Sequence, residues 1–145
     1  RASLFQRVRT ESSSALVVTE GLLVYLSEEQ VGALARDLSA AHGVRWWIID
    51  LASPRLLAIM QRWWGRQAAA GNAPFRFAPP QGTAFFRPFG WREVVFRASA
   101  EEARRLHREM RMAWLWRFIG RFASTAKREE FRRMSGIVSL EREPG

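Results

Sequence analysis

The segment from Leu16 to Ser27 constrains the fold more than any other part of the chain. A valine-rich apolar run ends in Glu20 and Gly21, and a helix signal follows within a few residues. An apolar run that does not alternate with polar residues is typical of a buried parallel strand. In an open α/β sheet, ligands bind at the carboxyl ends of such strands. The segment therefore predicts a strand over 15–18 and a candidate ligand-binding corner at Glu20.

Strand-like and helix-like segments alternate along the rest of the chain. The expected strands are 15–18, 45–50, 91–97 and 135–141, the expected helices begin at 27, 53 and 99, and a loop with a short helix near 82–86 spans 72–90. Ser27 and Gln30 have the spacing of a capping box, and Gly43 is placed to close that helix. Ser53 before Pro54 is a second start signal. This alternation predicts an α/β fold with helices on both faces of its sheet.

Three finer expectations concern the later helices and the aromatic loop. Ser99 and Glu102 predict a second capping box, which opens a helix that extends to about Phe122. The helix after Ser53 carries an apolar stripe expected to face the core: Leu56, Leu57, Met60, Trp63 and Trp64. The loop rich in phenylalanine, 75–89, is expected to pack against the fold, and closure over a substrate is its alternative.

Composition narrows the class of protein. With 145 residues, 48% hydrophobic and 26% charged, the chain has the length and balance of one globular domain. It has no cysteine, and His42 and His107 lack ligand spacing, so no metal site is expected. No apolar run is long enough to span a membrane, and the default location is cytoplasmic. The start at Arg1 rather than Met suggests a processed or fragmentary product.

The net charge of +9 raises a second class of function, a basic module that binds nucleic acid or an anionic membrane. The basic residues are almost all arginine and are spread from Arg1 to Arg142, which favours a solvated surface instead. His107 lies among arginines and is interpreted as part of a solvated helix face. The stretch 112–122 has the pattern of an interfacial helix, but a core-facing helix is preferred. Neither nucleic acid nor a membrane is therefore expected as a partner.

Three motifs, in the correct order, resemble the leucine carboxyl methyltransferase-like family. Residues 18–26 resemble the fourth-strand motif of these class I S-adenosylmethionine-dependent methyltransferases, 89–92 the start of the sixth strand, and 133–142 the final antiparallel strand. The resemblance implies a Rossmann-like sheet of about four strands, the last one antiparallel. It also implies that 1–145 is one partial domain, the carboxyl-terminal half of such an enzyme.

The family's glycine-rich first turn and the acidic residue that ends its second strand have no counterpart here. Gly21 and Gly43 are isolated glycines that form no cradle for a cofactor. The isolated chain is therefore expected to bind cofactor weakly or not at all. The strand at 15–18 would keep an open edge, and such an edge favours self-association or pairing with the missing half.

The resemblance also assigns roles to residues of the corner. It implies S-adenosylmethionine as the methyl donor, with Glu20, Thr19 and Gly21 as cofactor-binding residues. It implies methyl transfer to a carboxylate or hydroxyl oxygen of a small molecule, with Tyr25 and Asp50 toward that acceptor. The residues alone leave alternatives: Glu20 solvated at a strand end, Thr19 and Gly21 shaping the turn, Tyr25 packing, and Asp50 capping the next helix. No catalytic base is identified.

Overall fold

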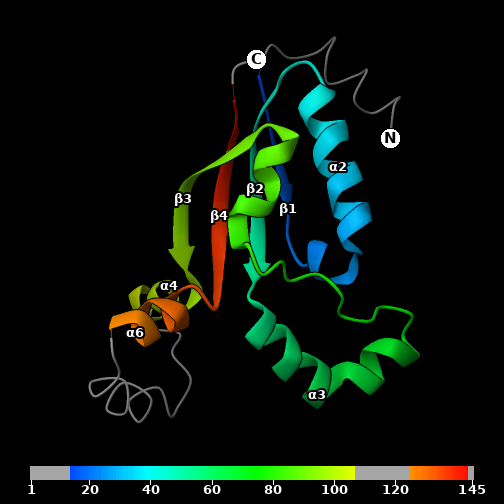
Figure 1. Cartoon of the computed structure of the whole chain (residues 1–145), viewed down its shortest axis with the longest axis vertical. Coiled ribbons are helices and arrows are strands. Elements are labelled where there is room, and N and C mark those ends of the chain that lie inside the picture. The colour runs from blue at the N-terminus through cyan, green and yellow to red at the C-terminus, as the bar shows by residue number, and fades with distance from the viewer. Residues whose placement is uncertain (1–13, 107–124, 144–145) are drawn as a thin grey trace.

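Four strands form one sheet in the part of the chain that the computed structural model describes, residues 14–106 and 125–143 (Figure 1). They are β1 (Ala15–Thr19), β2 (Val44–Ala52), β3 (Trp91–Ala98) and β4 (Ser135–Arg142). Each predicted strand is confirmed, with small differences at its ends.

The order of the strands in the sheet is β1-β2-β4-β3. β1 and β2 are parallel, whereas β4 is antiparallel to both of its neighbours, β2 and β3. β1, β2 and β3 therefore share one direction, and the last strand of the sequence is inserted between two earlier ones. The expectation of about four strands with an antiparallel last strand is confirmed.

The helices begin largely where the capping signals predict. The described α-helices are α2 (Glu28–Ala40), α3 (Pro54–Ala70), α4 (Ser99–Arg105) and α6 (Thr125–Arg132), with 3-10 helices η1 (Leu23–Tyr25) and η2 (Gly82–Phe89). The capping box of α2 is complete: the Gln30 amide donates to Ser27 Oγ at 3.3 Å, and the Ser27 amide donates to Gln30 Oε1 at 2.9 Å. Ser53 Oγ likewise accepts from the Leu56 amide at 3.3 Å and begins α3.

The second predicted capping box is wrong. α4 begins at Ser99 itself, after Ala98, and no side chain caps it. The reason is that β3 stays paired as far as Ala98, opposite Gly136, and passes directly into the helix. The Ser99 hydroxyl lies 2.8 Å from the Ser135 hydroxyl of β4. The expected continuation of this helix, with His107 and the stretch 112–122, lies outside the described residues.

One face of the sheet carries the hydrophobic core. Its fully buried side chains come from β2, β3, β4, α2, η2 and the segment before η2, and include Trp47, Ile49, Val138, Leu140, Val31, Leu38, Phe77, Phe86 and Trp91. Both buried indoles have acceptors: Trp47 Nε1 donates to Thr19 Oγ1, and Trp91 Nε1 donates to the Ala35 carbonyl, each at 3.0 Å. α2 and η2 therefore cover the same face of the sheet.

The opposite face, here called the open face, is not covered by any described helix. Its exposed apolar side chains are Leu16, Val18, Val95 and Ile137. The expectation of helices on both faces is thus wrong for the described residues.

The expected core contact of α3 is also wrong, because none of its residues is buried and the Trp63 side chain is 71% exposed. α3 starts at the carboxyl end of β2 and runs on beyond the end of the sheet (Figure 1). Leu56 and Met60, in its first half, are half-buried and line a small cavity with Leu51 of β2, whereas Trp63 and Trp64 are exposed.

Candidate functional site

The predicted corner lies where β1 and β2 end. Gly21, just after β1, has the left-handed φ of +60°, a conformation that favours glycine. Its amide donates to Asp50 Oδ1 at 3.1 Å, so a side chain of β2 holds the turn that follows β1. The structure therefore brings Glu20, Gly21 and Asp50 to one end of neighbouring parallel strands. We call these three residues the acidic corner.

Glu20 and Thr19 differ in their surroundings although they are adjacent. The Glu20 side chain is exposed and makes no hydrogen bond or ion pair with a described residue. The Thr19 hydroxyl accepts the Trp47 indole N–H on the covered face. Glu20 is thus accessible to a ligand at the corner, whereas Thr19 supports the core beneath it.

The structure decides between the alternative roles of Asp50 and Tyr25, namely capping of α3 by Asp50 and packing of Tyr25. Asp50 does not cap α3, because the hydroxyl of Ser53 does so. Tyr25 stacks on Phe75, with ring centroids 5.5 Å apart and ring planes at 28°. Asp50 is therefore part of the corner, and Tyr25 has the packing contact that was its alternative role.

Two cavities lie at the carboxyl ends of the strands. The small cavity, of about 190 Å³, is next to the acidic corner and is lined by Val24, Asp50, Leu51, Ala52, Leu56, Met60, Phe77 and Ser135. The larger one, here called the end cavity, has a volume of about 460 Å³. It is lined by Leu51, Ala52, Ser53, Pro54, Arg55, Pro79, Pro80, Gln81, Gly82, Thr83, Phe96, Glu130, Phe131, Arg133 and Met134. Leu51 and Ala52 line both cavities, so the two adjoin at the end of β2.

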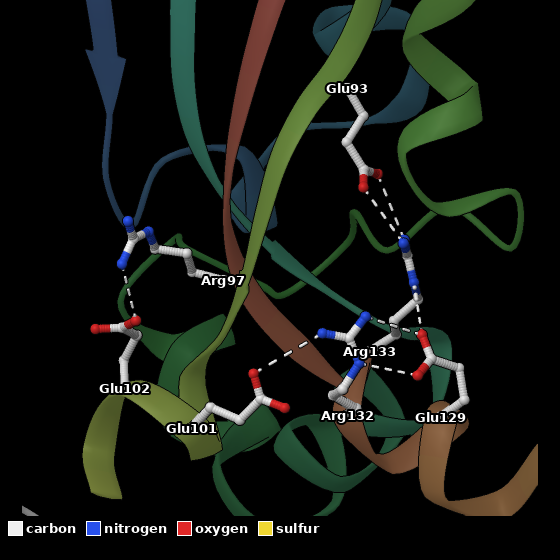
Figure 2. A network of polar contacts seen from close by, with 7 residues as sticks. All are labelled: Glu93, Arg97, Glu101, Glu102, Glu129, Arg132 and Arg133. Atoms are coloured by element: carbon white, nitrogen blue, oxygen red, sulfur yellow. Dashed lines mark hydrogen bonds and ion pairs between the residues drawn. The ribbon is translucent and has the colours of Figure 1, made fainter. Parts of the chain in front are cut away.

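An ion-pair network lies beside the end cavity, and one of its members, Arg133, lines that cavity (Figure 2). Arg133 bonds to Glu93 of β3 at 3.3 Å and to Glu129 of α6 at 3.2 Å. Burial alone raises the pKa of Glu93, but hydrogen bonds from Thr83 and Arg133 outweigh it and hold that pKa below its ordinary value. Hydrogen bonds from Arg132 lower the pKa of Glu129 in the same direction. The network thus joins β3, α6 and the start of η2 beside the cavity.

The aromatic loop contributes to the core more than to a substrate site. Phe77 and Phe86 are buried, and Phe85 packs edge-on against both, with centroids 5.1 Å and 5.2 Å away. These contacts confirm that the loop packs against the fold. Its alternative, closure over a substrate, is not what these rings do. The part of the loop that lines a cavity is instead 79–83.

The sequence did not indicate the end cavity. Its lining comes from four separate parts of the chain, which only the pairing of β4 with β2 and β3 brings together. In the sequence, residues 127–133 are recognisable only as a charged segment before the last strand. A proline pair at 79–80 was the available signal, since it fixes a rigid wall next to η2.

Comparison with models of known protein families and with curated proteins finds no match to this chain. No helix in the described ranges is both long and apolar enough to cross a membrane. No group of three or more His, Cys, Asp or Glu side chains in those ranges is arranged to hold a metal ion. The site is therefore interpreted from its geometry and from the motifs in the sequence.

Proposed function

We propose that this chain provides the carboxyl-terminal half of a class I S-adenosylmethionine-dependent methyltransferase that acts on an oxygen of a small molecule. The observation that carries the proposal is the strand order β1-β2-β4-β3 with β4 antiparallel. An antiparallel last strand inserted between its two predecessors is how the sheets of class I methyltransferases end. The three sequence motifs fall on β1 with its following turn, on β3 and on β4, in agreement with that order.

The acidic corner fits one side of a cofactor site. The exposed carboxylate of Glu20 stands at the carboxyl end of a parallel strand, the position where open α/β sheets bind ligands. It can accept hydrogen bonds from an ammonium group or from the polar edge of the donor. The hydrogen bond from the Gly21 amide to Asp50 holds the turn and so fixes the backbone position from which the Glu20 side chain extends.

The donor supplies an electrophilic methyl group on a sulfonium. The residues of this chain would bind and orient the partners of that transfer, because much of the catalysis of methyl transfer can come from positioning. The two cavities lie along the same edge as Glu20, on the side of β2 and β3, and offer room for an acceptor beside the donor.

The position of β1 at the edge of the described sheet also supports the proposal. β1 pairs with β2 alone among the described strands, so its outer edge has free backbone groups. Next to that edge, Leu16 and Val18 are 52% and 59% exposed on the open face. A second polypeptide half, or another copy of the chain, would cover both the edge and the face.

Isothermal titration with S-adenosylhomocysteine tests the proposal. We expect weak or no binding by the chain alone and binding once a glycine-rich half is supplied. Glu20→Gln should then weaken binding by about tenfold, whereas Glu28→Gln, an exposed acid on α2, should leave it unchanged. Micromolar binding by the chain alone would contradict the half-domain interpretation. A glycine-rich turn followed by an acidic residue in the coding sequence upstream of Arg1 would support it.

The alternative function, a basic module for nucleic acid or anionic lipid, is distinguished by salt. Binding through arginine to phosphates weakens steeply as ionic strength rises, while a cofactor pocket is less sensitive. Several arginines in the described ranges already pair with glutamates, such as Arg55, Arg97, Arg132 and Arg133. This pairing favours the methyltransferase proposal.

A further inference from the structure

We propose that the end cavity binds the methyl acceptor, and that this acceptor is an uncharged, mainly apolar molecule with a hydroxyl group rather than a carboxylate. That the ligand is a methyl acceptor rests on the proposed function. The preference of the cavity for a neutral ligand rests on its lining and can be tested without any cofactor.

The end cavity adjoins the acidic corner through the small cavity. Gly21 bonds to Asp50, Asp50 lines the small cavity, and the small cavity shares Leu51 and Ala52 with the end cavity. The acidic corner, the small cavity and the end cavity therefore follow one another along the carboxyl ends of β1 and β2.

The size and the walls of the end cavity match those of small-molecule sites. Ligand sites for small molecules typically have volumes of about 300–1,000 Å³ and mainly apolar walls. The end cavity, at about 460 Å³, is within that range. Its walls include the side chains of Leu51, Pro79, Phe96, Phe131 and Met134. A ring system of one or two rings is the natural occupant of such a space.

The charged side chains at the end cavity are all paired. Three charged side chains line it, and each has a partner of opposite charge. Arg55 and Glu130 pair with each other at 3.3 Å, and Arg133 pairs with Glu93 at 3.3 Å. Both arginines are exposed, so each pair contributes only modestly to stability. A carboxylate ligand would compete with a glutamate for an arginine that is already paired, whereas a neutral ligand leaves both pairs intact. The lining therefore favours a neutral acceptor.

The side-chain amide of Gln81 provides a polar group at the end cavity. The side-chain amide of Gln81 lines the cavity and makes no hydrogen bond with a described residue. An amide both donates and accepts, so it can bond to a hydroxyl in either direction. A hydroxyl can use both the donor and the acceptor of this amide, whereas a carboxylate can use only the donor. Together with the paired charges, this favours the hydroxyl among the two acceptor groups that the proposed function allows.

The test uses 2-naphthol and 2-naphthoate, two probes with the same ring system that differ in charge at neutral pH. Each is titrated into the chain without cofactor, and binding is followed by ligand-observed NMR. We expect 2-naphthol to bind at least about tenfold more tightly than 2-naphthoate. Phe131→Ala removes part of one wall from a half-exposed position and should weaken 2-naphthol by about fivefold.

A charge variant provides the matched comparison. Glu130→Gln leaves Arg55 without its partner, so 2-naphthoate should bind about threefold to tenfold more tightly while 2-naphthol stays unchanged. The control is Glu141→Gln, which removes the partner of Arg92 at the opposite end of β3 and should change neither probe. Both pairs involve exposed arginines, and circular dichroism verifies that each variant folds.

The outcomes separate this inference from the proposed function. Equal or tighter binding of 2-naphthoate by the unaltered chain would overturn it, as would no binding of either probe or no effect of Phe131→Ala. Preference for 2-naphthol with the expected response to Glu130→Gln would support it. Since these titrations contain no cofactor, failure of the S-adenosylhomocysteine test would leave their result intact.

Discussion

Replacing Gly136 with alanine tests the packing of β3 on β4. A Cβ on this residue would lie 2.5 Å from Phe96 Cζ and 2.8 Å from the carbonyl oxygen of Arg97. Real Cβ atoms do not approach other atoms so closely. The ring can rotate away, but the carbonyl belongs to the paired backbone of β3 and cannot move unless the strand moves. Gly136→Ala must therefore separate the two strands locally.

The magnitude follows from three contributions. Overpacking a well-packed site costs about 1–3 kcal/mol. A displaced Phe96 ring loses its contact with the guanidinium of Arg133, now 4.8 Å from the ring centroid, which is worth about 0.5–1 kcal/mol at a partly exposed site. The lower entropy of the unfolded chain returns about 0.4–1 kcal/mol. The net loss of unfolding free energy is thus about 1–3 kcal/mol.

Urea denaturation followed by circular dichroism measures this loss, with Gly65→Ala as the matched control. Gly65 lies within α3, and a Cβ there meets only Gln61 Cβ, at 3.8 Å. This variant should raise the unfolding free energy by up to about 1 kcal/mol, because alanine has the higher helix propensity. The two variants should move in opposite directions. Equal midpoints, or a Gly136→Ala chain as stable as the parent, would refute the close contact between β3 and β4.

Three further predictions follow from other contacts. Trp91→Phe should lower the unfolding free energy by about 2–3 kcal/mol, because it replaces the buried two-ring indole by a single ring and removes the donor to the Ala35 carbonyl. A loss below about 1 kcal/mol in urea denaturation would contradict this. Because the folded-state pKa of Glu93 lies below its ordinary 4.5, its contribution to stability is complete above that pH and is lost as the pH falls through the folded pKa. Unfolding midpoints measured between pH 6 and pH 3 should therefore fall less steeply in Glu93→Gln, and unchanged steepness would count against its bonds with Arg133. Val18→Lys, on the open face, should cost less than about 1 kcal/mol and weaken self-association in sedimentation velocity. A parent chain that sediments as a pure monomer at high concentration would refute that association.

Local signals predicted the elements that local interactions determine. The capping box at Ser27 joins residues three apart, so the sequence alone specifies it, and the same holds for the cap at Ser53. The valine-rich run of β1 was recognisable because a strand beside β2 needs little more than apolar residues. The position of Glu20 at the end of that strand follows from the same run.

Contacts between distant segments explain what the sequence did not predict. Ser99 has the residue type of a cap, yet the pairing of Ala98 with Gly136 carries the strand into the helix and leaves the hydroxyl for Ser135. The apolar stripe of α3 has the right period, but its later residues, Trp63 and Trp64, lie beyond the end of the sheet and are exposed. The end cavity requires segments separated by up to some eighty residues, and no spacing in the sequence announces it.

The late strand β4 has a consequence for how the protein is made. β2 and β3 each form their central pairing with β4, and neither has the other as a neighbour. Until β4 has left the ribosome, β3 has no described strand to pair with. The four-stranded sheet therefore forms only after β4 is available, and non-local pairing of this kind is slow to form. A chaperone that shields β3 during this interval would raise the yield of folded chain.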